Sequence, residues 1–511
     1  MKSVSVADWR ALVDKQLAGV AFDKALVHTT AEGLRVAPLY TEAPRLKVPP
    51  AAPRARLCVP TDGAGLDEDL AGGVDALWIR DRAALDAVLE RDTDCFLLLD
   101  ASLAGHPMSG RSFALLGDAL ASADVLARLA PYAPRTVLVS TLAHHEAGAD
   151  AADELALLLA TGAAHLRTVE TTGVDAETAL ARLTLQVSVG RDTFAELSKL
   201  RALRVVWQKM GAAVGAPAVS PFIHAVSSSR ALAQRDPWVN MLRVTTQVFA
   251  AILGGADLVT PATFDAALGA GDALGRRVAR NTLLVLRDES QLGRVRDPAA
   301  GSYYLDSFTD ALAREAWQRF RTLEAEGGIV EAQNSGRLAE RLAASWEKRR
   351  ARLDTRKEAV LGVSEFANLS EAKLPRGRSP ITGHRDAELF EALRDRSETK
   401  RSTVDLVTLG TPAEFGARVG FAESFFATGG LQAATGKQAA KVACLCGSDE
   451  RYAAEAAEAA HALKAGGCKR VLLAGRPGAL EAALRDAGVD DFLYIGCDAV
   501  SVLAGALEAL S

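Results

Sequence analysis

The sequence predicts an α/β protein with two βα domains: a (β/α)8-type TIM barrel, complete or degenerate, followed by a flavodoxin-like (Rossmann-like) sheet. Short apolar runs alternate with helical segments from about residue 56 to residue 290, and such a long βα series favours a parallel barrel. The same alternation returns over 399–511 with fewer strands. A Pro- and Gly-rich stretch, 374-LPRGRSPITGH-384, separates the two regions.

The bulk composition is that of a globular protein. The 511 residues are 49% hydrophobic and 24% charged, and the formal net charge is −5. Because there is no basic excess, we expect no nucleic-acid partner and no membrane surface as partner. No run reaches the ~18 apolar residues of a membrane helix, and the start, MKSVSVADWR, lacks the apolar core of a secretory signal. The six cysteines form no CxxC pair, which is typical of reduced thiols in a cytoplasmic protein.

Residues 1–50 are expected to form an N-terminal arm. Residues 5–17 have helical spacing, and 24–40 holds two alternating runs joined by a Gly-containing turn, which predicts a hairpin. A Pro- and Ala-rich connector, 44–55, follows. An arm of this size has too small a core to be stable alone, so we expect it to pack against the body or another chain.

Residues 51–325 are expected to form the barrel. Seven strands are predicted where a closed barrel needs eight, so one strand is either missed or lost. The predicted strands cover 56–60, 75–80, 95–100, 135–140, 184–190, 219–226 and 257–262. A helix over 191–210 carries an apolar stripe that includes Phe194, Trp207 and Met210.

Residues 326–398 are expected to form a helical and extended linker, and 399–511 the second domain. Five short strands with helical crossovers favour a doubly wound sheet. They cover 403–410, about 430–434, 441–447, 469–475 and 491–496. Cys444 and Cys446 alternate along one strand and so point to opposite faces, which argues against a shared metal site.

Local strings along nearly the whole chain resemble the adenosylcobalamin-dependent acyl-CoA mutases, above all the methylmalonyl-CoA mutase family. The strings are 31-AEGLRVAPLYT-41, 146-EAGADAADELALLLATG-162, 199-KLRALRVVW-207, 278-VARNTLLVLRDES-290 and 296-RDPAAGSYYLDSFTDALAREAW-317. The resemblance implies a TIM barrel, a helical linker and a cobalamin-binding-type C-terminal domain. It also implies which residues a catalytic member of the family would carry.

The first group of these residues binds the cofactor in catalytic members. Catalytic members carry D-x-H-x-x-G at the first turn of the C-terminal domain, where the His ligates cobalt and the Asp orients its ring. When 409-LGTPAEFGARVG-420 is laid on this motif, Pro412 falls at the Asp position, Glu414 at the His position and Ala417 at the Gly position. Proline has no side-chain acceptor, and a carboxylate is a harder ligand than imidazole. We therefore predict an ordinary βα connection that lacks the cobalt-ligand motif.

A second group of these residues lies in the barrel. Catalytic members place a Tyr-His pair before the string E-A-G-A, and here Leu142 and Ala143 stand at those positions. We interpret the next two residues, His144 and His145, as solvated or hydrogen-bonded loop histidines, because an offset of one or two residues re-aims a side chain beyond what catalysis tolerates.

Two further barrel positions bear on the resemblance. Catalytic members carry an arginine that pairs with the substrate carboxylate, and in the corresponding stretch, 101–120, the single arginine is Arg111. We interpret Arg111 as a surface residue. His224 matches a family histidine at a strand end, and we interpret it as buried with satisfied hydrogen bonds.

These departures lead to one hypothesis, which rests on the resemblance. We expect a non-catalytic small (beta) subunit that supports a homologous large subunit in a heterodimer. The large subunit would hold adenosylcobalamin and interconvert (R)-methylmalonyl-CoA and succinyl-CoA, while this chain would carry no catalytic, cofactor or metal site and bind no acyl-CoA. Two alternatives stay open: a divergent catalytic mutase that uses an unusual residue such as Glu414, and a stand-alone acyl-CoA-binding regulatory protein.

Overall fold

The structure, a computed structural model, describes residues 4–51, 54–91, 93–103, 113–116, 137–269, 271–372, 374–377, 379–398, 403–436 and 440–510. The chain divides into two compact units. Unit 1 consists of Met1–Ser228, Arg243–Thr263 and Asp272–Trp346, and unit 2 consists of Ser229–Leu242, Phe264–Gly271 and Glu347–Ser511. Each unit combines segments that are far apart in the sequence, whereas the predicted domains were continuous. The predicted domain boundaries after residues 50, 325 and 398 therefore stay a prediction.

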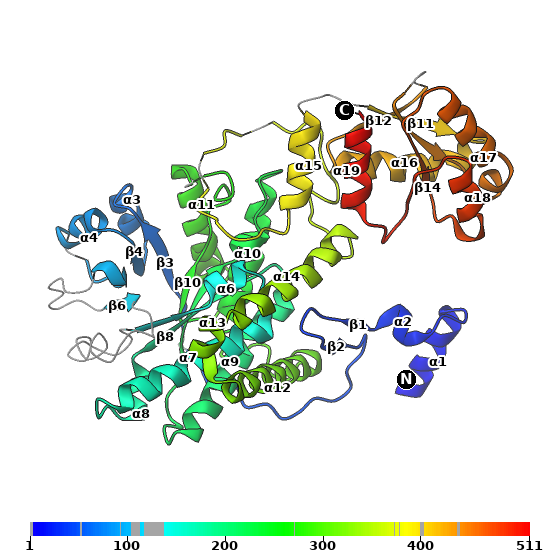
Figure 1. Ribbon diagram of the computed structural model, residues 1–511. Helices are drawn as coiled ribbons and strands as arrows, with labels where there is room; N and C mark the ends of the chain where they lie inside the picture. Colours follow the sequence, from blue (N-terminus) through cyan, green and yellow to red (C-terminus); the bar gives the residue numbers. More distant parts are fainter. Residues whose placement is uncertain are drawn as a thin grey trace. The chain divides into compact units, whose positions relative to one another are not determined.

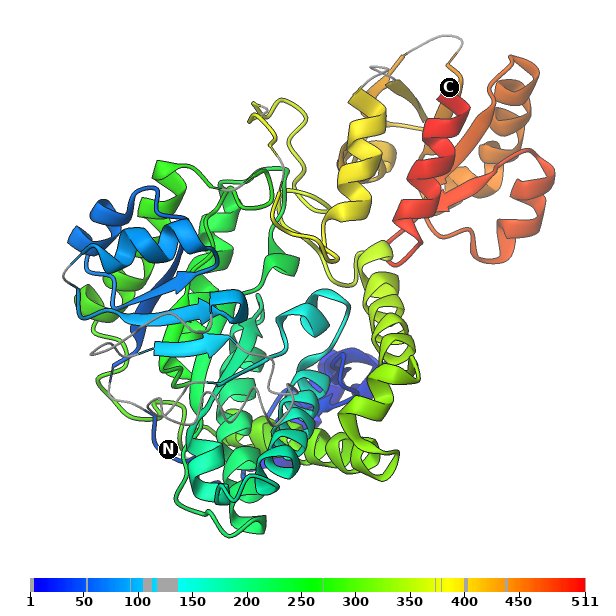
Figure 2. The ribbon, with the colours of Figure 1, turned by 60° about the vertical axis from the view of Figure 1, so that its left-hand side comes forward.

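Parallel strands form the barrel of unit 1 (Figure 2). In the described residues the hydrogen-bonded order is β6-β5-β4-β3-β10-β9-β8-β7, so the first barrel strand, β3, pairs with the last, β10. The two ends of this order, β6 and β7, also contact each other, which gives the strand order of a TIM barrel and confirms the predicted fold. The strands are β3 Arg56–Thr61, β4 Ala76–Ile79, β5 Phe96–Asp100, β6 Phe113–Leu116, β7 Val137–Ser140, β8 Leu183–Val189, β9 Phe222–Ser227 and β10 Leu258–Thr260.

Strand β6 is the eighth strand, which the sequence did not predict. It pairs in parallel with β5, with Leu97 opposite Phe113 and Asp100 opposite Leu116. Its apolar run is only four residues long, and it follows a stretch rich in Gly, Ser and Pro. So short a run is hard to tell from a loop by pattern alone. The strand was therefore missed rather than lost.

Helices follow most of the barrel strands and cover the outside of the sheet (Figure 1). The long helix α12 packs against both α7 and α9. On α9 the side chains of Trp207 and Met210 are buried as predicted, but Phe194 is exposed. Phe194 lies in the first turn of the helix and meets the ring of Tyr304 edge-on at 6.0 Å. The helices are α3 Leu66–Ala71, α4 Arg82–Leu89, α6 Leu142–Glu146, α7 Ala151–Glu170, α8 Ala176–Ala181, α9 Thr193–Ala213, α10 Val239–Leu253, α11 Ala273–Leu284, α12 Tyr303–Ala325, α13 Gly328–Asn334 and α14 Arg337–Asp354.

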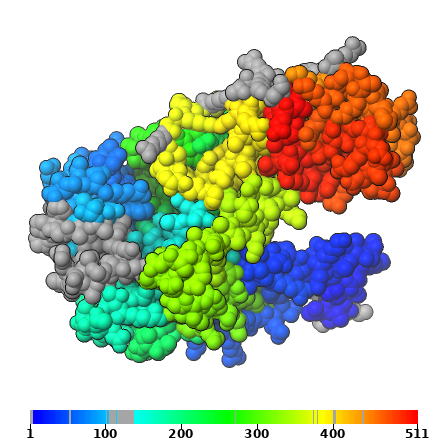
Figure 3. Space-filling view, in the orientation of Figure 1, coloured from blue at the N-terminus to red at the C-terminus, as the bar shows by residue number. Residues whose placement is uncertain are grey.

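The N-terminal arm forms a lobe of its own at the surface of unit 1 (blue in Figure 3). It contains α1 Val6–Gln16, α2 Phe22–Leu26 and a two-stranded hairpin of β1 His28–Thr29 and β2 Arg35–Val36. The predicted helix and hairpin are confirmed, but the beginning of the first predicted strand is helical. No described residue before Val36 is buried. The arm therefore has almost no core.

The sheet of unit 2 has the strand order β12-β11-β13-β14-β15, all parallel. This is the doubly wound order of a flavodoxin-like fold, so the predicted Rossmann-like domain is confirmed. The strands are β11 Thr403–Thr408, β12 Gln432–Thr435, β13 Val442–Cys446, β14 Arg470–Ala474 and β15 Asp491–Leu493. The helices are α15 Glu388–Glu398, α16 Pro412–Thr428, α17 Asp449–Ala465, α18 Glu481–Asp486 and α19 Ala499–Leu510.

The described helices are all either too short or too polar to cross a lipid bilayer. All six cysteines are free thiols.

Candidate functional site

The turn between β11 and α16 lies where a flavodoxin-like sheet binds its ligand. β11 has β12 on one side and β13 on the other, so the chain changes its direction across the sheet here and leaves a crevice outside the strand ends. Gly410 has a φ of 86°, which only glycine adopts without strain. The helix then begins at Pro412, whose fixed φ suits a first helical position. A ligand-binding side chain would have to start from this turn.

Glu414 closes the beginning of α16. Its Oε2 accepts hydrogen bonds from the backbone N and the hydroxyl of Thr411, both at 2.7 Å, and its Oε1 accepts one from Arg451 Nε at 2.8 Å. The hydrogen bond from Arg451, together with the Thr411 donors, lowers the pKa of Glu414 to about 2. Both carboxylate oxygens are engaged within the chain, so Glu414 acts as a helix cap.

Tyr452 occupies the space at the ends of β13 and β14. Its hydroxyl accepts a hydrogen bond from Gly447 N at 2.9 Å and lies 2.7 Å from Ala474 O, to which it donates. A Cβ added at Gly475 would come within 3.1 Å of the Tyr452 ring and within 2.8 Å of Arg418 Nη1. Burial raises the pKa of this phenol above its usual value. The space directly outside the ends of these two strands is thus taken up by the Tyr452 side chain.

This edge does not fit the cobalt-ligating arrangement of the catalytic mutases. Pro412 supplies no side-chain acceptor, and Glu414 has its carboxylate tied to Thr411 and Arg451. Over the described residues, no three or more His, Cys, Asp or Glu side chains are grouped as a metal site requires. The turn is a capped βα connection, as expected; that it binds no cobalamin stays a prediction.

A hydrogen-bonded chain of side chains crosses the inside of the barrel. Ser140 on β7 donates to Gln186 Oε1 on β8 at 2.7 Å, and Gln186 Nε2 lies 3.0 Å from His224 Nδ1 on β9. His224 Nε2 in turn lies 2.8 Å from Thr260 Oγ1 on β10. Four successive strands thus share one polar layer in the packed interior.

The environment of His224 keeps its imidazole neutral. The ring is fully buried, which lowers its pKa to about 3. The Gln186 amide donates to Nδ1, so the ring proton sits on Nε2 and is donated to Thr260. Both ring nitrogens are satisfied, which confirms the interpretation of His224 as a buried, hydrogen-bonded histidine.

The short helix α6 carries the positions at which catalytic members have Tyr and His. Leu142 and Ala143 occupy its first turn and offer no hydrogen-bonding side chain. His145 is buried and makes side-chain contacts on both ring nitrogens, so the hydrogen-bonded alternative is confirmed for it and the solvated one is wrong. Burial lowers the pKa of His144, its neighbour in the same helix. Both histidines are helical and not in a loop.

A buried charged cluster next to His145 was missed by the sequence analysis. Glu154 on α7 and Lys199 on α9 form an ion pair of 3.2 Å, and both side chains are 1% exposed. Lys199 also pairs with Glu196 at 2.6 Å. Buried charges are unusual on helices whose polar faces normally meet solvent. The signal was the place of each charge directly before a leucine in a largely apolar run: Glu154 precedes Leu155, and Lys199 precedes Leu200.

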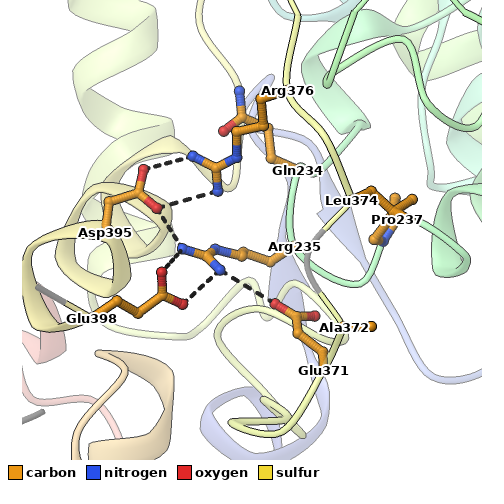
Figure 4. A pocket seen from close by; sticks show the side chains of 9 residues that line it. All are labelled: Gln234, Arg235, Pro237, Glu371, Ala372, Leu374, Arg376, Asp395 and Glu398. Carbon is orange, nitrogen blue, oxygen red and sulfur yellow. Dashed lines mark hydrogen bonds and ion pairs between the residues drawn. The ribbon is translucent and has the colours of Figure 1, made fainter.

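Arg111, interpreted as a surface residue, lies outside the described residues. Another arginine, Arg235, faces a cavity of about 260 Å³ in unit 2 (Figure 4). Its guanidinium contacts Glu398 at 2.7 and 3.0 Å and also pairs with Asp395. Arg376 pairs with Asp395 from the other side at 2.8 Å. At this cavity the guanidinium groups of Arg235 and Arg376 are thus occupied by carboxylates of the chain.

A family model and several known proteins that match this chain all belong to one family. The family model for methylmalonyl-CoA mutase matches residues 122–429. A methylmalonyl-CoA mutase small subunit from Streptomyces virginiae is 36% identical, with 98% of this chain and 96% of the relative aligned. A probable small subunit from Mycobacterium bovis is 40% identical over 74% of this chain, and the small subunit from Propionibacterium freudenreichii subsp. shermanii 35% identical over 76%. These two alignments cover 65% of each relative's length.

Proposed function

Because this chain belongs to the methylmalonyl-CoA mutase family, we propose that it is the small, non-catalytic subunit of a heterodimeric mutase. In this proposal a homologous large subunit holds adenosylcobalamin and interconverts (R)-methylmalonyl-CoA and succinyl-CoA. The small subunit takes no part in the isomerisation and supports the large one. The six free thiols are consistent with a cytoplasmic location for the complex.

One observation carries the proposal: the side chain at the cobalt-ligand position is used to build the helix that begins there. Glu414 accepts hydrogen bonds from Thr411 and Arg451 on both of its oxygens. A side chain that ligated cobalt would instead need a lone pair that is free for the metal. The place of Tyr452 at the ends of β13 and β14 supports the same inference, because a bound cofactor would need space at the strand ends.

The N-terminal arm is the surface that we propose contacts the large subunit. Its exposed apolar side chains are those of Val4, Val6, Leu12, Val20, Leu26 and Leu39. A segment that leaves its apolar residues in water gains almost nothing from folding alone. We infer that these side chains become buried against the large subunit when the complex forms.

Three measurements test the proposal. Mixing the purified chain with the large subunit and sizing the product by native mass spectrometry should give a one-to-one complex. A chain that stays alone at micromolar concentration contradicts the proposed assembly.

The second measurement is a titration of the isolated chain with hydroxocobalamin, whose visible spectrum shifts when a protein ligand binds cobalt. We expect no spectral shift and no colour retained after desalting. A retained, shifted spectrum would favour a divergent catalytic mutase instead. Calorimetry with methylmalonyl-CoA and free coenzyme A should give no heat of binding; a measurable affinity would favour the acyl-CoA-binding alternative.

A further inference from the structure

His145 lies between a carboxylate and a hydroxyl. Its Nδ1 is 2.9 Å from Glu154 Oε1, and its Nε2 is 2.7 Å from Ser228 Oγ. The three residues come from α6, from α7 and from the position directly after β9. All three are at most 2% exposed, so water competes little for these hydrogen bonds.

This arrangement has the order of an acid, a base and a nucleophile. A carboxylate at Nδ1 holds the ring proton on that nitrogen and leaves the lone pair of Nε2 directed at the serine hydroxyl. Such a site is recognised by geometry and by the role of each group, whatever their order in the chain.

The carboxylate is itself held in place. Glu154 pairs with Lys199 at 3.2 Å, and its Oε2 accepts a hydrogen bond from Ser188 N at 3.3 Å. Thr141 Oγ1 lies 3.4 Å from the same oxygen. These contacts fix the orientation of the Glu154 carboxylate toward His145.

The position in the fold is the one that barrel enzymes use. β7 ends at Ser140 just before α6, and Ser228 follows the end of β9. In TIM barrels the chemistry is carried at these carboxyl ends of the strands.

We propose that Ser228, His145 and Glu154 form a serine-hydrolase site that acts on small activated acyl groups, as esters or thioesters. This activity is separate from the isomerisation and does not depend on the proposed subunit role. Ser228 Oγ bonds to the acyl carbon while His145 Nε2 takes its proton. The bond from that carbon to the leaving oxygen or sulfur breaks, and His145 gives the proton to the leaving group.

Hydrolysis of the acyl-serine completes the cycle. A water molecule attacks the acyl carbon, and His145 takes one of its protons and returns it to Ser228 as the carbon–Oγ bond breaks. The products are a carboxylic acid and an alcohol or thiol, and no oxidant or reductant is consumed. Because Ser228 is 2% exposed, only a small acyl group is expected to reach it.

The test uses the full chain with p-nitrophenyl acetate and, in a second arm, with S-methyl thioacetate, a small thioester that lacks the coenzyme A moiety. We expect release of nitrophenol or thiol above the uncatalysed rate, and an acetyl group on the peptide that contains Ser228 in acid-quenched samples analysed by mass spectrometry. The rate should rise with pH through one ionisation, as expected for a histidine base. Release from only one of the two substrates identifies the preferred leaving group.

Matched variants separate this role from a structural one. Ser228→Ala should remove the excess rate and the acetyl-peptide, and His145→Gln should lower the rate at least ~100-fold. The control variants Ser227→Ala and His144→Ala change the neighbouring serine and the neighbouring histidine. Both should keep the hydrolysis rate of the unmodified chain. Circular dichroism checks that each variant is folded.

If Ser228→Ala does not fold, Ser228→Cys replaces it. The thiol introduced by that substitution should then react with iodoacetamide faster than the six native cysteines, because His145 would activate it. The proposal is overturned if the unmodified chain hydrolyses both substrates no faster than Ser228→Ala, or if acetyl is found only on other residues. It is also overturned if the thiol introduced by Ser228→Cys reacts no faster than the native thiols.

Discussion

Glu414 Oε1 and Arg451 Nε lie 2.8 Å apart, and this ion pair joins the first turn of α16 to the first turn of α17. The two helices follow neighbouring strands, β11 and β13, whose ends flank the crevice of the sheet. A residue that stands at the position of a cobalt ligand thus serves to connect two helix beginnings. The carboxylate at this position makes an interaction that stabilises the fold.

Replacing Glu414 with Gln should lower the melting temperature only slightly, by about 1–2 °C at pH 7, because exposed ion pairs contribute little. The pKa of Glu414 in the folded chain is lowered to about 2, below its unfolded value near 4.3. Its contribution is therefore complete above about pH 4.3 and is lost as the pH falls toward 2. Differential scanning fluorimetry from pH 7 to pH 3 measures the difference.

The matched control for Glu414 is Glu458→Gln, which changes an exposed glutamate further along α17. It should leave the melting temperature unchanged throughout this range. A difference between Glu414→Gln and the unmodified chain that grew as the pH fell below 4 would contradict the assigned interaction.

The buried pair of Glu154 and Lys199 gives a much larger expected effect. Glu154→Ala should lower the free energy of unfolding by about 3–5 kcal/mol, because Lys199 would lose a buried counter-charge. Urea unfolding followed by circular dichroism measures the loss. Glu170→Ala changes an exposed glutamate of the same helix and should change it by less than about 0.5 kcal/mol. Equal losses in the two variants would show that the buried pair is not fixed as described.

His224 should make the barrel sensitive to acid. Its pKa in the folded chain is lowered to about 3, while an unfolded histidine titrates near 6.5. Between these two pH values His224 binds a proton in the unfolded chain but not in the folded one. The free energy of unfolding therefore falls as the pH drops from 6.5 toward 3. Between pH 7.5 and pH 5.0 this residue alone should cost about 2 kcal/mol.

Urea unfolding of His224→Asn at both pH values measures this contribution, since the variant should lose that part of the pH dependence. His461→Asn, at an exposed position of α17, should keep the full pH dependence. A slope that is the same in His224→Asn and in the unmodified chain would mean that His224 is protonated in the folded barrel.

The fold class could be predicted from the sequence because it rests on long, repeated patterns. Seven barrel strands and five strands of the second sheet were found from alternating apolar runs and helical segments. β6 was not found, because four apolar residues give no period. Phe194 was misplaced because helical spacing gives a stripe but does not say where, at a helix beginning, the stripe leaves the core.

The candidate site could be predicted only in part. Pro412 and Glu414 were recognised because the resemblance places them in one short motif. Lys199 and Ser228 were not, because the fold brings them to Glu154 and His145 from distant parts of the chain. Glu154 lies only nine residues after His145, but the sequence does not show that its side chain meets the imidazole. A sequence pattern can place a charge on a helix face, but it gives no distance between residues on separate strands and helices.

The arm is expected to matter for assembly and not for the stability of the barrel. Residues 4–27 include no buried residue, so deletion of residues 1–27 should leave the melting temperature of the isolated chain within about 1 °C of its original value. Deletion of residues 1–36 should lower the melting temperature, because this deletion removes buried Val36 and the hydrogen bonds that Glu32 accepts from Ala151 and Arg319.

The shorter deletion, of residues 1–27, should already weaken binding to the large subunit at least ~10-fold, since five of the exposed apolar side chains are then gone. Scanning fluorimetry and biolayer interferometry measure the two effects. If the shorter deletion destabilised the isolated chain, the arm would belong to the body; if it left the affinity unchanged, the partner would bind elsewhere.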